Sequence, residues 1–124
     1  MSVTVVDASA IASVLLDEST AAEIKALLEE QDLTAPRLLP FEFANVCAIR
    51  ARRFPEKRDL FLEAIITFAE LSIRLREVDM EGVFVLAERH RLTAYDASYL
   101  WLANELGAEL VTLDKDLAAA FANS

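Results

Sequence analysis

The 124-residue sequence is poor in cysteine, histidine, glycine and proline, with one, one, two and three of each. The single cysteine, Cys47, excludes an internal disulfide framework and is typical of a reducing compartment, so we expect a cytoplasmic protein. The single histidine, His90, excludes catalysis by a pair of imidazoles, and one histidine with one cysteine argues against a zinc site. The few glycines and prolines argue against a disordered linker.

The sequence also lacks a long apolar run and an excess of basic residues. No uncharged apolar segment approaches the ~20 residues that span a bilayer, and the first residues do not resemble a signal peptide, so we expect a soluble protein without a membrane partner. Twelve lysines and arginines stand against 21 acidic residues, a net charge of −9. Proteins that simply coat nucleic acid are usually basic. An acidic chain is nevertheless compatible with a site for divalent cations, because bound metal reverses the local field.

Short apolar segments alternate with amphipathic ones along the whole chain. The pattern predicts strands at 3–6, 32–36, 73–78 and 108–113. It predicts helices at 8–18, 21–31, 38–53, 56–71, 80–91, 93–106 and 114–124. Alternation of this kind is typical of a parallel sheet covered by helices on both faces. We therefore expect one α/β domain over residues 1–124, a three-layer α/β/α sandwich with a short, four-stranded parallel sheet.

Four acidic residues follow the predicted strands at positions where a ligand would bind. Asp7 comes directly after the first strand and Asp114 directly after the last. Glu42 lies near the start of the helix after the second strand, and Asp96 lies in the first turn of the helix before the last strand. Ligands of open parallel sheets bind beyond the carboxyl ends of the strands. We expect these four side chains to meet at that edge.

Each acid taken alone also has a purely structural interpretation. Asp7 and Asp114 are suitable helix N-caps, Glu42 would complement a helix dipole, and Asp96 follows Thr93 at the spacing of a capping box. Capping does not explain why all four should gather at one end of one sheet. Four neighbouring carboxylates repel one another unless a cation is bound. Carboxylate oxygens suit Mg²⁺ or Mn²⁺, and such ions can activate water against a phosphodiester.

Four segments, "VVDASA", "PFEFANV", "YDASYL" and "LVTLDKDL", resemble in this order the motifs of the PIN domain, and the chain is most similar in size to the VapC-type ribonucleases of toxin–antitoxin systems. The resemblance implies Mg²⁺- or Mn²⁺-dependent endonucleolytic cleavage of RNA. It further implies an antitoxin partner and a homodimer. PIN domains usually end with another strand after the last helix, and no apolar segment remains here to form it, so we expect that edge strand to be missing or vestigial.

The same resemblance assigns roles to individual residues. Asp7 and Asp96 would be the principal metal ligands, and Glu42 and Asp114 would complete the catalytic acidic cluster. The supporting polar residues would be Ser9, Asn45 and Thr112, with Asp116 as an outer contributor.

Two questions stay open from the sequence. The segment "RARRFPEKR" contains Arg50, Arg52 and Arg53, which would contact RNA, form a solvated helix connection or face an acidic partner. The domain could also be a non-catalytic binding module whose metal is structural. Phosphoryl transfer by an aspartate nucleophile is a weaker alternative. Phosphatases of the haloacid-dehalogenase type need a second aspartate where this chain has Ser9.

Overall fold

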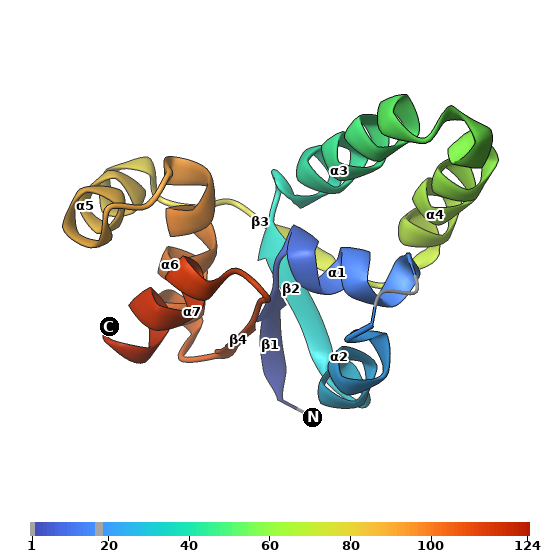
Figure 1. Ribbon diagram of the computed structural model, residues 1–124. Coiled ribbons are helices and arrows are strands. Elements are labelled where there is room, and N and C mark those ends of the chain that lie inside the picture. Colours follow the sequence, from blue (N-terminus) through green and yellow to red (C-terminus); the bar gives the residue numbers. More distant parts are fainter. Residues whose placement is uncertain (1, 17–18) are drawn as a thin grey trace.

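The computed structural model describes residues 2–16 and 19–124. A parallel sheet of four strands forms its centre, in the order β3-β2-β1-β4 (Figure 1). The strands are β1 (Val3–Val6), β2 (Asp32–Pro36), β3 (Arg74–Arg76) and β4 (Glu109–Val111). In the register, Val5 pairs with Thr34 of β2 and with Leu110 of β4, and Thr34 pairs with Arg74 of β3.

Helices cover both faces of this sheet and form the two outer layers (Figure 1). The helices on one side are α1 (Ala8–Leu15), α2 (Ala21–Leu28), α3 (Leu39–Arg53) and α4 (Arg58–Glu70), the last preceded by the short 3₁₀ helix η1 (Pro55–Lys57). The helices on the other side are α5 (Met80–His90), α6 (Ala94–Leu106) and α7 (Lys115–Ala122). Helix α6 packs directly on β1, β2 and β4, and α5 packs on α6.

The core lies between these layers and explains why the elements form where they do. The strands β1 and β2 place Val5, Val6 and Ala35 in the interior with no exposed surface. From the helices, Phe43 of α3 and Leu100 of α6 are equally buried. Phe68 of α4 stacks on Phe43 with ring centroids 4.9 Å apart. Burial of these apolar side chains from both sides of the sheet is the main source of stability for the three layers.

The predicted three-layer α/β/α sandwich with four parallel strands is confirmed. No strand follows α7 in the described part of the chain, so β4 is an edge strand, as expected. Helices and outer strands are shorter than the sequence pattern indicated: α2 ends at Leu28 rather than at 31. The predicted end of the first helix, at 17–18, lies outside the described residues. Among the described residues, none of the helices is long and apolar enough to cross a membrane.

Candidate active site

The strand order changes direction between β1 and β4, which places a crevice at the carboxyl ends of these two strands. The chain moves from β1 outward to β2 and β3, then returns across the sheet to β4 beside β1. The intervening helices therefore change faces, and ligands of such sheets bind where this reversal occurs. Asp7 follows β1 and Asp114 comes three residues after β4, so both lie at this point.

Asp7 is almost fully buried, with 5% of its surface exposed, and its carboxylate is held by three hydrogen bonds. Its Oδ1 accepts the Ala10 backbone N–H at 3.0 Å and the Ser9 hydroxyl at 2.7 Å. Its Oδ2 accepts the Thr112 hydroxyl at 2.5 Å. Asp7 is thus the N-cap of α1, as its structural interpretation required. A carboxylate offers about four lone pairs, so Oδ2 still has room for one more ligand.

Ser9 and Thr112 join the loops after β1 and β4 to each other. The Ser9 hydroxyl accepts the Leu113 backbone N–H at 2.8 Å, and the Thr112 hydroxyl accepts the Asp114 N–H at 3.0 Å. Each hydroxyl therefore orients Asp7 while it fixes the loop that carries Asp114. Asp114 itself caps α7, because its Oδ1 accepts the Leu117 N–H at 2.9 Å.

Glu42 reaches the site from the first turn of α3 and is held by a residue of α6. The Tyr99 hydroxyl donates to Glu42 Oε1 at 2.6 Å, and Tyr99 is completely buried. Burial raises the pKa of Glu42, the Tyr99 hydrogen bond lowers it, and the charges of Asp96 and Asp7 raise it. The same environment raises the pKa of Tyr99 well above that of a free phenol, so this hydroxyl acts as a donor.

Asp96 enters the site from the first turn of α6. The Thr93 hydroxyl accepts the Asp96 backbone N–H at 3.1 Å, which completes the N-cap that the sequence indicated. Burial raises the pKa of Asp96, and the charges of Asp114, Asp7 and Asp116 raise it further.

The pKa values of Asp7, Glu42 and Asp96 show that the four acids share one electrostatic environment. Burial is the largest cause of each rise, and every neighbouring charge that adds to it is negative. The ion pairs lie elsewhere in the described residues, between Arg37 and Glu77 and between Arg58 and Asp59. The site is therefore a region of uncompensated negative charge, which a cation would stabilise.

The donor set suits a hard divalent ion, although the side chains do not form a closed cage. Within residues 2–16 and 19–124, no three His, Cys, Asp or Glu side chains are placed to share one metal ion. Mg²⁺ usually takes only one or two protein carboxylates and completes its shell with water and substrate phosphate. Free lone pairs on carboxylates from several elements fit that requirement.

Other residues that the sequence singled out lie at the margin of the site or away from it. Asp116, in the first turn of α7, is exposed and acts on Asp96 through its charge. Asn45 is exposed, one turn beyond Glu42 on α3, and no side-chain hydrogen bond places it on the acids in the described structure. The arginine cluster Arg50, Arg52 and Arg53 occupies the last turn of α3, about 12–16 Å along the helix from Glu42.

Tyr99 was not predicted from the sequence to belong to the site, where its hydroxyl holds Glu42. The missed signal was weak: a tyrosine on a nearly all-apolar helix, three residues after Asp96, must place its buried hydroxyl against a partner. That partner is Glu42, and only the hydrogen bond seen in the structure identifies it.

Fold and site together define the class of the protein. The model of the PIN domain family matches residues 4–122, and the chain belongs to this family. The chain is 34% identical over 122 residues to ribonuclease VapC3 of Pyrobaculum aerophilum, covering 94% of this chain and 93% of that protein.

Solved structures show the same fold. The crystal structure of PAE2754 from Pyrobaculum aerophilum matches with a TM-score of 0.77 and 27% identity, over 94% of this chain and 83% of the other. That of Mycobacterium tuberculosis VapC20, a sarcin-ricin loop cleaving toxin, matches with a TM-score of 0.68 and 16% identity, over 94% of both chains. The predicted PIN resemblance is therefore confirmed.

Proposed function

We propose that this protein is a divalent-metal-dependent endoribonuclease and the toxin of a VapBC-type toxin–antitoxin pair. The observation that carries the proposal is that acids from four segments lie near the reversal point of the sheet, where burial and neighbouring negative charges raise the pKa values of Asp7, Glu42 and Asp96. Membership of the PIN family and the similarity to ribonuclease VapC3 support the same reaction class.

In this proposal Asp7 and Asp96 hold the ion, and Glu42 and Asp114 complete the site. Mg²⁺ or Mn²⁺, when bound, would supply an activated water and stabilise the departing oxygen of the phosphodiester. Ser9 and Thr112 keep the Asp7 carboxylate oriented through their hydrogen bonds. Glu42, whose raised pKa brings its titration closer to neutrality, is placed to accept a proton from the attacking water.

The partners follow from the same proposal. They are an RNA substrate, an antitoxin protein and a second copy of the chain. The protein would act in the cytoplasm, and residues 1–124 would form a single PIN domain. An antitoxin segment that covers the site should be basic, because the site and the chain, at a net charge of −9, are acidic. Arg50, Arg52 and Arg53 remain proposed contacts for RNA or for an acidic partner.

The reaction is tested with purified protein and a single-stranded RNA. Cleavage should require Mn²⁺ or Mg²⁺, stop with EDTA and resume when excess metal is added. A protein that binds the metal but leaves RNA intact would instead be a binding module, in which Asp7 and Asp114 serve as helix caps.

The toxin role has a separate test in cells. Induced expression should arrest growth, and co-expression of a small protein encoded beside this gene should relieve the arrest. Normal growth at high expression of a protein that cleaves RNA in vitro would contradict the toxin role and leave the nuclease assignment intact.

A further inference from the structure

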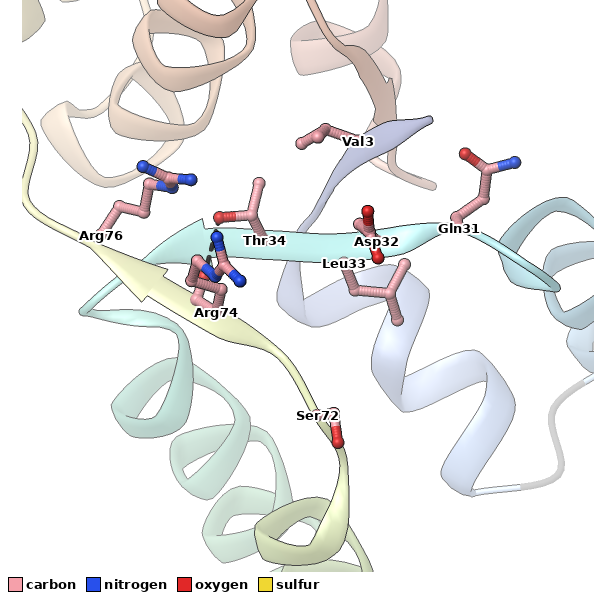
Figure 2. A pocket seen from close by; sticks show the side chains of 8 residues that line it. All are labelled: Val3, Gln31, Asp32, Leu33, Thr34, Ser72, Arg74 and Arg76. Carbon is pink, nitrogen blue, oxygen red and sulfur yellow. Dashed lines mark hydrogen bonds between the residues drawn. The ribbon is translucent and has the colours of Figure 1, made fainter. Parts of the chain in front are cut away.

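A hollow of about 210 Å³ lies on the open part of the sheet, over β2 and β3 (Figure 2). Its polar lining comprises Gln31, Asp32, Thr34, Ser72, Arg74 and Arg76. Helix α6 packs on β1, β2 and β4, so the edge strand β3 receives less cover on this side. The hollow contains two arginines in a chain with a net charge of −9.

The charges of these two arginines are not balanced by an acid in the described residues. Arg76 Nε is buried and lacks a hydrogen-bond acceptor in the described structure. Neither guanidinium forms an ion pair within residues 2–16 and 19–124, although Asp32 lines the same hollow. A buried donor without an acceptor is costly, so its presence favours an acceptor from outside the protein. Guanidinium groups suit phosphate oxygens because their N–H donors match them in pairs.

The sheet register places Arg76 at the same edge of the sheet as Asp7, two strands away. Arg76 pairs with Pro36, and Val5 pairs with Thr34. Continued by two residues, the register puts Asp7 level with Pro36, two strand spacings or about 10 Å from Arg76. Successive side chains alternate between faces, so Arg74 and Arg76 share the face of the sheet on which Thr34 lines the hollow. Asp32 lies at the opposite end of β2, level with Val3 and remote from the acids.

We propose that Arg74 and Arg76 bind a backbone phosphate of the RNA whose scissile bond lies at the acidic site. The inference rests on the proposed ribonuclease function. The two arginines supply positive charge near the acidic site. An acidic cleft repels a polyanion such as RNA and needs nearby cationic side chains to bind it. The interaction is independent of base sequence, since it is made to the phosphate.

The test is equilibrium binding of a fluorescent single-stranded RNA in EDTA, where no cleavage occurs. Arg76→Gln should weaken binding about 10-fold, and Arg74→Gln/Arg76→Gln more than that. The slope of log affinity against log salt should fall by about 0.7 for each phosphate that the variant no longer neutralises. Lys25→Gln removes the same charge from the exposed surface of α2 and should change binding less than about 2-fold. The Arg74→Lys/Arg76→Lys variant keeps both charges and should recover part of the affinity.

Several results would overturn the inference. Wild-type binding and salt slope in the double glutamine variant would do so, as would equal losses in Arg76→Gln and Lys25→Gln. Binding of an acidic peptide but not of RNA would assign the hollow to a protein partner instead. If the wild type cleaves RNA with Mn²⁺ and the arginine variants bind normally, only the inference fails. If the wild type neither cleaves nor binds RNA, the proposed function fails as well.

Discussion

Two groups of arginines carry the same kind of charge but lie differently with respect to the acidic site. Arg50, Arg52 and Arg53 crowd the last turn of α3, where Arg53 lies over the Phe54 ring at 5.4 Å. Arg74 and Arg76 are separated by a leucine in a three-residue strand and do not stand out in the sequence. The first group is about 12–16 Å along a helix from Glu42. In the second group, Arg76 lies about 10 Å from the level of Asp7 across the sheet.

Sheet register, rather than local charge density, determines which arginines lie at the same edge of the sheet as Asp7. A basic cluster at the far end of a helix is moved away from the acids by about 1.5 Å for every residue. An isolated arginine on a neighbouring strand is brought to the same edge as Asp7 by pairing alone. The acids themselves follow the same rule, because Asp7 and Asp114 are far apart in sequence and meet through β1 and β4.

Mutating the acids of the site should have a larger effect on RNA cleavage than mutating either arginine group. Asp7→Asn or Asp96→Asn should lower metal-dependent RNA cleavage by at least about 100-fold. Mutating a residue that merely orients a metal ligand already lowers metal affinity or activity by about 10–100-fold. Asparagine remains a good N-cap, so Asp7→Asn should leave the α1 cap in place. Cleavage rates in Mn²⁺ and the far-ultraviolet circular dichroism spectrum measure the two effects.

Asp59→Asn is the matched control for these variants. Asp59 is fully exposed in its ion pair with Arg58, on α4. The Asp59→Asn protein should cleave RNA at the wild-type rate. Cleavage above a tenth of the wild-type rate in the folded Asp96→Asn protein would remove Asp96 from the metal site.

The second prediction tests the two arginine groups directly. Arg74→Gln/Arg76→Gln should raise the KM for RNA about 10-fold or more with little change in kcat, because it removes binding to a phosphate away from the reacting bond. Arg52→Gln/Arg53→Gln removes the same charge at the end of α3 and should raise KM less, by about 2-fold, because any contact that these arginines make with RNA lies farther from the acidic site. Steady-state cleavage of one RNA by both variants decides the matter. A larger KM for the α3 variant would reverse the comparison.

The same distinction between local pattern and register explains how much of the fold was predictable. The strands at 3–6 and 32–36 were predicted to the residue, because their runs are apolar and bounded by Asp7 and Pro36. The strand predicted at 73–78 shrinks to Arg74–Arg76, because only three residues of β2 pair with it. The helix predicted to 31 stops at Leu28, where Glu30 takes a left-handed conformation with φ of 60° and turns the chain into β2.

The site was predictable to the extent that its residues follow strand ends. Asp7 and Asp114 are recognisable as acids after strands, and the charges of neighbouring acids contribute to the raised pKa values of Asp7, Glu42 and Asp96, while their role as a metal site stays a prediction. The Tyr99 hydrogen bond was not predictable, because it joins side chains that are 57 residues apart in the sequence. The proposed role of Arg76 was not predictable either, since it depends on pairing between β2 and β3, which α3, η1 and α4 separate in the chain.

The third prediction concerns Tyr99 and the titration of Glu42. Tyr99→Phe removes a hydrogen bond that lowers the pKa of Glu42, so this pKa should rise further. Because the carboxylate form of Glu42 is the proposed base, the acidic limb of the pH–rate profile should move to higher pH. We expect the fractional loss of rate to be largest on the acidic limb of the profile and to shrink as pH rises. Tyr95→Phe alters an exposed tyrosine of the same helix and should leave the profile in place. A uniform loss at every pH would show that Tyr99 acts only through packing.

The smallest expected effect is on the stability of the metal-free protein. The folded-state pKa of Asp96 is raised, so the native protein binds more protons than the unfolded chain as pH rises above the ordinary aspartate range. The contribution of Asp96 to the free energy of unfolding is therefore full below the unfolded pKa and falls as pH rises through the folded pKa. Asp96→Asn removes this repulsion and should raise Tm by about 1–3 °C at pH 7.5 in EDTA, with no gain at pH 4.

The effect should reverse when metal is present, which separates charge relief from other causes. A cation bound to the wild type stabilises the folded state by mass action, and Asp96→Asn should lose most of that gain. Thermal unfolding with and without Mn²⁺ measures both the gain in Tm without metal and the loss of stabilisation by the metal. Asp59→Asn, which lies outside the acidic cluster, should show the wild-type response in every condition. If Asp96→Asn lowered Tm at pH 7.5 in EDTA, the Asp96 carboxylate would be a net stabilising group. Repulsion among the four acids would then not destabilise the protein without a bound cation.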